Sequence, residues 1–544
     1  MRKAIRLEFI ILAVILFCSF PALGQVRPSV LLKNVNVIGR DGKIQENVDV
    51  SMEGNEILDV GPNLKPRRNQ TVLDKSGKFV IPGLIDTRVQ IGSSPGNRIN
   101  RAELGEEQRI AWMHSMVKLG VTTARFIQGD LTEHTGFKHF RTFNLLNSPW
   151  IVVSGPTFTA VDGSPANQYD LVATNTRVRE VYEVADETEA IQKSREVAHN
   201  GADIFEISYL EGPRWVPAPR LKDDLLSLLT KEAHGHELKA FCWVGTNAEA
   251  KVAIERGCDV LEGLTEEVAD QDLLHLMAEK KTAFVPSLIA QGYLMTEKTS
   301  PPALLSYIAE DYVARALSPL MKKSFQTGTI QVGNIRAALG HLVPEPPPVK
   351  PASDKAPTKP ESDSPSGSRA GSSPENKSDA AQKPQSDAGT QPNTGAGAAG
   401  SVPLSPAGSQ QSAENARRPT VGEALRSQEQ RARENAKQMA AAGIPIVVGT
   451  GAGTLLDIPG ASEHTEMQLL VDAGLTPLQA LQAATSNAAY ALGKPSEFGA
   501  VEKGKLADVI VLEANPLEDI RNTTKIDTVI RGSWIINQDD PTQY

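Results

Sequence analysis

Polar and charged residues stand near the carboxyl ends of several short apolar segments, where a catalytic or binding site is expected. Arg88 and Gln90 lie in the segment 83–91, and Glu206 lies in the segment 203–208. A guanidinium and a carboxylate that face each other can form a bidentate pair. We therefore predict an ion pair between Arg88 and Glu206, with separate solvation of the two groups as the alternative.

Cys242 lies near the end of the segment 239–244 and is a candidate nucleophile. A thiol needs a neighbouring base and a lowered pKa to act in this way. No nearby strand-end position supplies a histidine, which argues against this role. Cys258 precedes the next strand and is predicted about a strand length from Cys242, so a disulfide between them is not expected.

A second group of candidates follows the segment 444–450. Glu463, His464 and Glu466 offer carboxylates and an imidazole, which are common ligands of divalent metal ions. A divergent site could also combine His464 with Glu206 and Glu262. The alternative is that His464 and Glu466 lie on the following helix and serve the structure.

Eight short apolar segments alternate with helical patterns in the middle of the chain. They are 83–91, 121–127, 150–155, 203–208, 239–244, 259–264, 283–288 and 444–450. Eight strand–helix units favour an α/β fold with a parallel (β/α)8 TIM-like barrel, whose chemistry lies at the carboxyl ends of the strands. Short strands separated by turns, near both ends of the chain, predict a small β-sandwich built from both termini.

The stretch 476–493 carries the signals of a helix. Thr476 is the predicted N-cap, Pro477 takes the first helical position and Gln479 completes a capping box. Gly493 is the predicted C-terminal stop.

Several phrases of the sequence resemble the amidohydrolase superfamily, in particular its imidazolonepropionase-like and Xaa-Pro dipeptidase-like branch. They include "GKFVIPGLID", "NGADIFEI", "ERGCDVLEGL", "IPIVVGTGAGT" and "GAVEKGKLADVIVLEANPLEDI". Phrases of this kind occur in the family's order through nearly the whole chain outside residues 342–418. The resemblance implies the barrel fold and a metal-bound water that attacks a carbonyl-type carbon.

The resemblance also implies metal ligands at the strand ends, and this sequence departs from the family at each of them. The altered positions are Arg88 and Gln90 on the first strand, Glu206 on the fourth, Cys242 and Val244 on the fifth, Gly263 on the sixth and Gly451 on the eighth. Arginine has no lone pair for a metal, and glycine and valine offer no side-chain ligand. No cofactor is therefore predicted, although the family uses zinc or another divalent metal.

The remaining sequence divides the chain. Residues 1–24 have a basic start, an apolar core too short to span a bilayer and a small-residue end, which predicts a signal peptide and export to the periplasm or the extracellular space. Residues 25–81 with 496–544 form the predicted β-sandwich, and 82–341 with 419–495 form the barrel. Residues 342–418 are rich in Pro, Ser, Gly and Ala and are predicted to be a disordered insert. The net charge of −9 does not indicate nucleic-acid binding, and no later segment predicts a membrane span.

Three functions remain open from the sequence. The first is a pseudoenzyme that binds a small molecule, forms a homo-oligomer or joins an active paralogue. The second is an active hydrolase of dipeptide or non-peptide C–N bonds with a divergent metal site or a metal-free mechanism. The third is a structural or assembly protein without a pocket. The fold alone does not decide among them.

Overall fold

The computed structural model describes residues 28–91, 106–142, 147–165, 180–211, 218–289, 421–453 and 458–536. The described residues all belong to one compact unit. The predicted signal segment and the predicted disordered insert lie outside the described residues. No helix among the described residues is long and apolar enough to cross a membrane.

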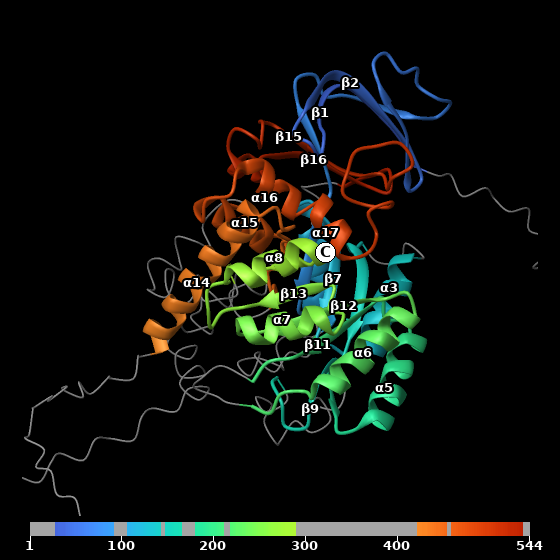
Figure 1. The fold of residues 1–544 in the computed structure, drawn as a ribbon. Helices are drawn as coiled ribbons and strands as arrows, with labels where there is room; N and C mark the ends of the chain where they lie inside the picture. The colour runs from blue at the N-terminus through green and yellow to red at the C-terminus, as the bar shows by residue number, and fades with distance from the viewer. Residues whose placement is uncertain are drawn as a thin grey trace, which may run out of the picture. The chain divides into compact units, whose positions relative to one another are not determined.

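Both ends of the chain contribute to one β-sheet. Its N-terminal strands are β1 (Ser29–Ile38), β2 (Ile44–Glu53), β3 (Glu56–Gly61), β4 (Thr71–Asp74) and β5 (Phe79–Pro82). Its C-terminal strands are β15 (Asp508–Leu512), β16 (Ile526–Arg531) and β17 (Trp534–Ile536). The order is β17-β16-β15-β5-β1-β2-β3, with β4 beside β1, so β15 pairs directly with the N-terminal strand β5 (Figure 1).

Alternating apolar residues give this sheet its own core. Val30, Leu32 and Val37 of β1 pack with Val509 and Val511 of β15 in one buried cluster. Alternate residues of a strand point to opposite faces, so this face of β1 is buried against residues from the other end of the chain. An isolated bridge between Glu56 and Leu506 also links the far edge of the sheet to the segment before β15. This arrangement is compatible with the predicted composite β-sandwich.

The middle of the chain forms parallel sheets. One sheet contains β6 (Leu84–Val89), β7 (Val121–Ile127) and β8 (Trp150–Gly155). The other contains β9 (Thr157–Ala160), β10 (Val181–Val184), β11 (Ile204–Ser208), β12 (Lys239–Val244), β13 (Val260–Gly263) and β14 (Ala283–Val285). Seven of the eight predicted strands therefore coincide with strands of the structure. The sequence analysis did not predict β9 and β10.

The eighth predicted strand, 444–450, forms bridges instead of a regular strand. Phe284 of β14 donates its backbone N–H to Pro445 O at 2.9 Å, and Thr87 of β6 donates to Val448 O at 3.0 Å. This segment therefore lies between the last strand of one parallel sheet and the first strand of the other. Parallel strands β8 and β9 follow each other directly in the chain, and β11 contacts both.

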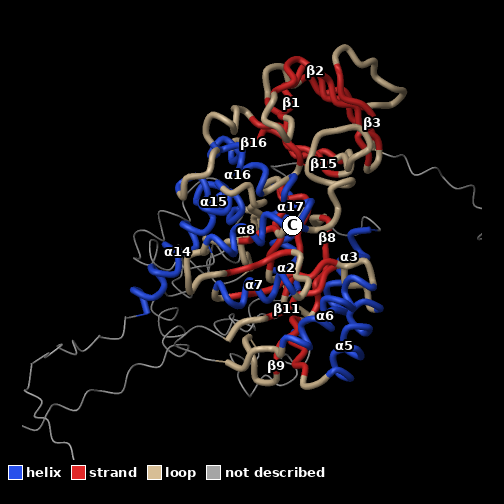
Figure 2. Tube along the Cα trace, viewed as in Figure 1, coloured by secondary structure: helices blue, strands red, loops and turns tan. Residues whose placement is uncertain are grey.

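Helices surround these parallel strands (Figure 2). They are α2 (Glu106–Lys118), α3 (Leu131–Thr142), α5 (Glu187–His199), α6 (Asp223–Gly235), α7 (Asn247–Glu255), α8 (Gln271–Lys280), α14 (Val421–Ala441), α15 (Ala461–Asp472), α16 (Pro477–Ala483) and α17 (Ser486–Ala491), with the 3-10 helix η5 (Ile520–Thr524). The capping box of Thr476 and Gln479 is confirmed. The predicted helix that follows it is divided into α16 and α17, and Gly493 takes a positive φ of 73° directly after the end of α17.

The two faces of the parallel strands belong to different cores. Phe241, Ile204 and Val260 pack together on the inner face, where Ala488 and Ala489 of α17 join them. Cys242 and Leu261 pack with Ala253 of α7 on the outer face, in the core that the strands share with the helices. Successive residues of one strand therefore point alternately to the inner and the outer face. Only the side chains on the inner face can take part in a site between the strands.

Cys242 and Cys258 form a disulfide, with their Cα atoms 6.0 Å apart. The prediction that they remain unpaired is wrong. Cys242 points to the outer face, and the turn after α7 folds over that face before β13 begins. Cys258 donates its backbone N–H to Ala253 O of α7, and Asp259 donates to Ala240 O of β12. The prediction relied on the separation of the two cysteines along the strand direction. The turn after α7 removes this separation, because it brings Cys258 back to Cys242.

Candidate functional site

A buried arginine that the sequence analysis missed lies at the centre of the candidate site. Arg125 stands in the middle of β7, and its side chain is fully buried. Its Nε donates to the backbone oxygen of Thr87, and its Nη2 donates to Glu262 Oε1. Its guanidinium carbon lies 3.9 Å from the centre of the Phe241 ring. A buried guanidinium needs such partners because its desolvation is costly.

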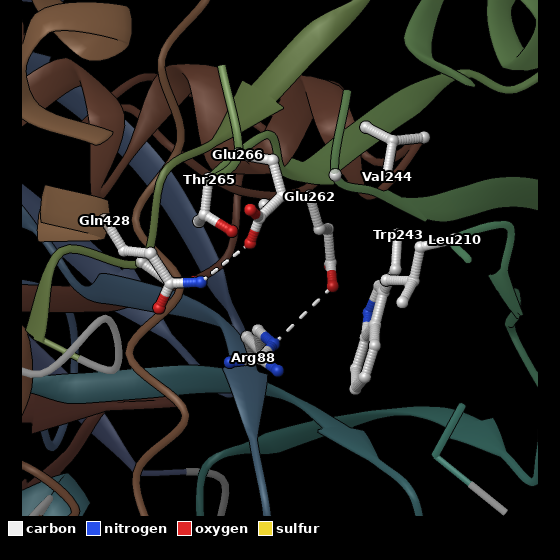
Figure 3. Close-up of a pocket in the computed structure, with 11 residues that line it drawn as sticks. Arg88, Leu210, Trp243, Val244, Glu262, Thr265, Glu266 and Gln428 are labelled. Carbon is white, nitrogen blue, oxygen red and sulfur yellow. Dashed lines mark hydrogen bonds and ion pairs between the residues drawn. The ribbon is translucent and has the colours of Figure 1, made fainter. Parts of the chain in front are cut away.

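Arg88 approaches the same carboxylate from β6. Its Nε lies 3.6 Å from Glu262 Oε2, and its guanidinium carbon lies 4.8 Å from the ring centre of Trp243 (Figure 3). The backbone of Arg88 is held by Asp86, whose Oδ1 accepts the Arg88 N–H at 2.9 Å. We call these three side chains the Arg125–Glu262–Arg88 network. Both oxygens of Glu262 thus face a guanidinium.

The carboxylate that pairs with Arg88 is Glu262, not Glu206 as predicted. Among the described residues, no contact of ion-pair length joins Arg88 to Glu206. Strand register gives the reason. Glu206 is the register partner of Phe241, whereas Glu262 is the partner of Trp243, two residues further along the strand. Two residues of a strand span about 6–7 Å, so Glu206 lies one layer deeper.

Glu206 is fully buried and has an altered pKa. Burial raises the pKa of its carboxyl to about 7, the charge of Arg125 opposes this shift, and the charge of Glu262 adds to it. The Thr157 hydroxyl lowers the pKa slightly, but neither carboxyl oxygen has a hydrogen-bond partner of normal geometry among the described residues. A carboxyl in this state changes its charge near neutral pH.

A cavity of about 140 Å³ opens beside this network. Arg88, Trp243 and Glu262 line one part of it, with Ser287 beyond β14. Gln428 of α14 forms another part and donates to Glu266 Oε1 at 3.0 Å (Figure 3). The long helix that follows the insert therefore supplies one wall of the cavity.

The resemblance assigns metal ligands to several other positions. The side chains at these positions do not bring metal-binding atoms together at this cavity. Gln90 hydrogen-bonds to Gln128. Cys242 is committed to the disulfide, and Val244 packs in the outer core although it borders the cavity. Gly451 donates its N–H to Arg88 O at 2.6 Å.

Position 263 differs from the family's pattern in its backbone conformation as well as in its lack of a side chain. Its φ is +98°, a region that L-residues rarely adopt, and a Cβ placed there would lie 2.7 Å from Val244 O. A histidine cannot be placed at this position without a change of the backbone.

The candidate ligands His464, Glu466 and Glu262 contact three different sets of partners. His464 of α15 contacts Leu119 O and Thr523 Oγ1 at 2.9 Å through its two ring nitrogens. Glu466 accepts the backbone N–H groups of residues 288 and 289, each at 2.8 Å. Glu262 is held by the two arginines. The alternative interpretation of His464 and Glu466 as helical, structural residues is therefore favoured.

Glu463 belongs to a separate buried acidic pair. It accepts the N–H of Gly460 at 2.9 Å and adjoins Asp86. Burial raises the pKa of Glu463 well above its usual value, and the neighbouring carboxyl of Asp86 adds to the shift. Burial also raises the pKa of Asp86. Two buried carboxyls in contact retain a proton at neutral pH, which suits a structural link and not a metal ligand.

The residues present do not fit a hydrolytic metal centre of the family's kind. Among the described residues, no group of three or more His, Cys, Asp or Glu side chains is placed to hold a metal ion. Arg88 stands at a position that the resemblance assigns to a metal ligand, and Arg88 and Arg125 both face Glu262, the carboxylate that could have served as a ligand. A charged residue inside the apolar segment 121–127 was the one sequence signal for Arg125.

Comparison with known proteins gives a family match over the C-terminal part of the chain. Residues 398–535 match the model of the Amidohydrolase family. Ochratoxinase of Aspergillus niger is 43% identical over 82 residues, which cover 15% of this chain and 16% of that protein. Imidazolonepropionase of Shouchella clausii is 28% identical over 110 residues, which cover 19% of this chain and 24% of that protein. These matches span less than a quarter of either relative's length.

Solved structures extend the similarity to the whole fold. A prolidase complexed with N-methylphosphonate-L-proline has a TM-score of 0.62 and 17% identity, covering 94% of this chain and 99% of that one. The ochratoxinase of A. niger has a TM-score of 0.61 and 17% identity, covering 94% and 95% of the two chains. The family match is therefore carried by residues 398–535, and the solved structures show that the chain shares the fold of these amidohydrolases. Its altered strand ends distinguish it from the pattern that the family's chemistry requires.

Proposed function

We propose that this protein is a ligand-binding pseudoenzyme on a closed eight-stranded amidohydrolase barrel. The observation that carries the proposal is the Arg125–Glu262–Arg88 network, in which Arg88 occupies a position that the resemblance assigns to a metal ligand and Glu262 precedes another, Gly263. The network supplies fixed positive charge without a metal. The adjoining cavity favours a binding role over a purely structural one.

The relatives suggest which reactions to examine. They are named as a prolidase, a Xaa-Pro dipeptidase, an ochratoxinase and an imidazolonepropionase. An active version of this chain would therefore hydrolyse acyl-proline dipeptides or cyclic amides. Such a reaction through a metal needs ligands that the described residues do not bring together.

Metal content and hydrolysis together test the proposal. The purified chain is incubated with Zn²⁺, Mn²⁺ or Co²⁺, desalted, analysed for bound metal and assayed with an acyl-proline dipeptide and a cyclic amide. We expect less than stoichiometric metal and no hydrolysis that a chelator abolishes. One bound metal ion per chain with chelator-sensitive hydrolysis would contradict the proposal. Metal-independent hydrolysis that is lost in Glu206→Gln would instead support the second function.

A single variant distinguishes two explanations for the altered site: loss of the ligand side chains alone, or a change of the backbone that carried them. Gly263→His restores a histidine at one former ligand position, but its Cβ conflicts with Val244 O. We expect this variant to lose stability and to gain no metal binding. A variant with retained stability and new zinc binding would show that the backbone still accommodates the family's site.

We also propose that the protein is exported. The Cys242–Cys258 disulfide supports this, because disulfides persist in oxidising compartments and are rare in the cytosol. The disulfide supports export independently of the predicted signal segment 1–24. Expression of the full chain, with thiol titration and mass measurement of each cell fraction, tests the proposal. A cytosolic chain in which Cys242 and Cys258 are free thiols would contradict it.

A further inference from the structure

One wall of the cavity carries a carboxylate without a cationic partner. Glu266 lines the cavity beside Gln428, whose side-chain amide donates to Glu266 Oε1 at 3.0 Å (Figure 3). In the part of the chain that the structure describes, no lysine, arginine or histidine nitrogen lies within 4.0 Å of the Glu266 carboxylate. Glu266 therefore presents a negative charge to the cavity, and a neutral amide is its one side-chain partner among these residues.

The structure behind this wall is also acidic. Glu249 is buried, and its carboxylate accepts the backbone N–H groups of Glu211, Gly245 and Thr246 at 2.7–3.0 Å. Within the described ranges, no cationic side chain pairs with Glu249. A Cβ placed on Gly245 would lie 3.2 Å from Glu249 Oε2 and 3.5 Å from Glu266 Cγ. Gly245 lines the cavity, so both glutamates lie next to this wall.

The arginine in the lining is already paired. Arg88 Nε lies 3.6 Å from Glu262 Oε2, and its guanidinium carbon lies 4.8 Å from the ring centre of Trp243. Arg125 also contacts Glu262, but it is fully buried and does not line the cavity. The described lining therefore carries one positive and two negative charges, and the charge without a counter-ion is that of Glu266.

Unfilled acceptors in the lining outnumber unfilled donors. Ser287 Oγ and Glu262 Oε2 are buried without a hydrogen-bond partner among the described residues, and both side chains are 2% exposed. Carboxylate and hydroxyl oxygens accept hydrogen bonds. Trp243 Nε1 is the one donor of the described lining in the same state. Buried polar groups without partners call for a ligand or water, and here the ligand must mainly donate.

We propose that the cavity binds a small primary ammonium cation, which pairs with Glu266 and donates its remaining N–H groups to Glu262 and Ser287. This inference rests on the proposed ligand-binding function. A metal ion does not fit as the cation, because no group of three or more His, Cys, Asp or Glu side chains among the described residues is placed to hold one. An ammonium group supplies three donors and one positive charge, which match the acceptors and the net charge of the lining.

The rest of the lining sets the size of the ligand. Leu210, Val244 and the ring of Trp243 give the cavity an apolar side. The volume of about 140 Å³ corresponds to roughly four or five water molecules at about 30 Å³ each. An ammonium group with a short aliphatic chain fits this volume.

Calorimetric titration with propylammonium chloride tests the inference. Propanol and sodium propionate are the matched ligands, because they have a similar size but no charge or the opposite charge. Sodium chloride at the same ionic strength gives the background heat. At pH 7 we expect propylammonium to bind, and we expect no measurable binding of propanol or propionate.

Variants of Glu266 test the position of the cation. Glu266→Gln removes the charge but keeps an oxygen that accepts from Gln428. It should weaken propylammonium binding at least about tenfold, because a charge-assisted hydrogen bond is lost. Glu266→Asp keeps the charge and should retain part of the affinity. Glu279→Gln removes an exposed carboxylate of α8 outside the lining and should have no effect.

Three outcomes would overturn the inference: no binding of propylammonium, equal binding of propanol or propionate, or full affinity in Glu266→Gln. Thermal unfolding of each variant shows whether folded proteins are compared. If Glu266→Gln does not fold, Ser287→Ala takes its place, and unchanged affinity in that variant overturns the inference. None of these results bears on metal content, so the proposed loss of the metal centre can stand or fall separately.

Discussion

At the scale of single residues, the Arg125–Glu262 pair is a sensitive point of the structure, because both side chains are buried. Arg125 is fully buried, and Glu262 is nearly so. Buried pairs of this kind add little net stability when intact, but removal of one partner leaves an isolated charge in the interior. The arginine is therefore required once the carboxylate is present.

We expect Arg125→Met to lower the free energy of unfolding by about 3–5 kcal/mol, because Glu262 loses its closest partner. Urea denaturation measures the loss. The double variant Arg125→Met with Glu262→Met should recover most of it, because the orphaned charge is removed as well. Equal stabilities of the single and double variants would show that the pair is not the source of the effect.

His134 links stability to pH. It is fully buried in α3, and one ring nitrogen contacts Ile91 O at 2.9 Å. Burial lowers its pKa from 6.5 to about 4. Between these values the unfolded chain binds a proton and the folded chain does not. The contribution of neutral His134 to the free energy of unfolding is therefore complete above about pH 6.5 and is lost as pH falls toward 4.

We expect His134→Gln to show a smaller loss of unfolding free energy than the unaltered protein between pH 7 and pH 4.5. The difference should be about 2–3 kcal/mol, from roughly two pKa units at 1.36 kcal/mol each. Urea denaturation at several pH values measures it. His139→Gln, on the exposed side of α3, is the control. Parallel pH profiles for both variants would contradict the assignment.

At the scale of elements, α14 is fastened to the loop between β13 and α8 by one buried side chain. Asn435 donates to Leu264 O at 2.8 Å and to Glu267 O at 3.0 Å, and it accepts the N–H of Ala269 at 2.7 Å. Arg431 adds a hydrogen bond from its Nε to Thr265 O. This loop carries Thr265 and Glu266 of the cavity, so α14 helps to hold the cavity wall.

We expect Asn435→Ala to lower the free energy of unfolding by about 3 kcal/mol, because three buried backbone groups lose their partners. Amide hydrogen exchange should increase at residues 264–269. Gln438→Ala, which removes a contact within α14 itself, is the matched control. Unchanged exchange in the loop would show that α14 does not hold it in place.

At the scale of the whole molecule, the C-terminal strands are part of the core. β15 is buried at all five positions and pairs with β5 and β16. Its Val509 and Val511 face the core of the β-sheet, whereas Ile510 and Leu512 face the core of the parallel strands. One strand therefore serves two hydrophobic cores.

We expect a chain that ends after residue 495 to accumulate in the insoluble fraction, because loss of β15 exposes apolar residues in both cores. A chain that ends after residue 536 keeps all three C-terminal strands and is the control. Soluble expression and circular dichroism of the two chains measure the difference. A soluble, cooperatively unfolding 495-residue chain would contradict the shared-core interpretation.

The sequence by itself determined the order of most elements and the absence of the family's metal-ligand residue types at the strand ends. Apolar periodicity and capping residues are local, so strands such as β11 and the start of α16 could be predicted. The absence of histidine or aspartate at positions such as 88 and 451 is also a property of the sequence alone. Both depend on residue type and spacing, which do not change on folding.

The tertiary structure decided how the remaining residues pair. The direction in which a strand residue points, inward for Glu206 or outward for Cys242, is set by packing between distant segments. Strand register then placed Glu262 and not Glu206 beside Arg88, and the turn after α7 brought Cys258 to Cys242. Arg125 became a central residue only because Thr87, Phe241 and Glu262, from three other strands, converge on it. Such contacts join residues far apart in the chain, and no local pattern encodes them.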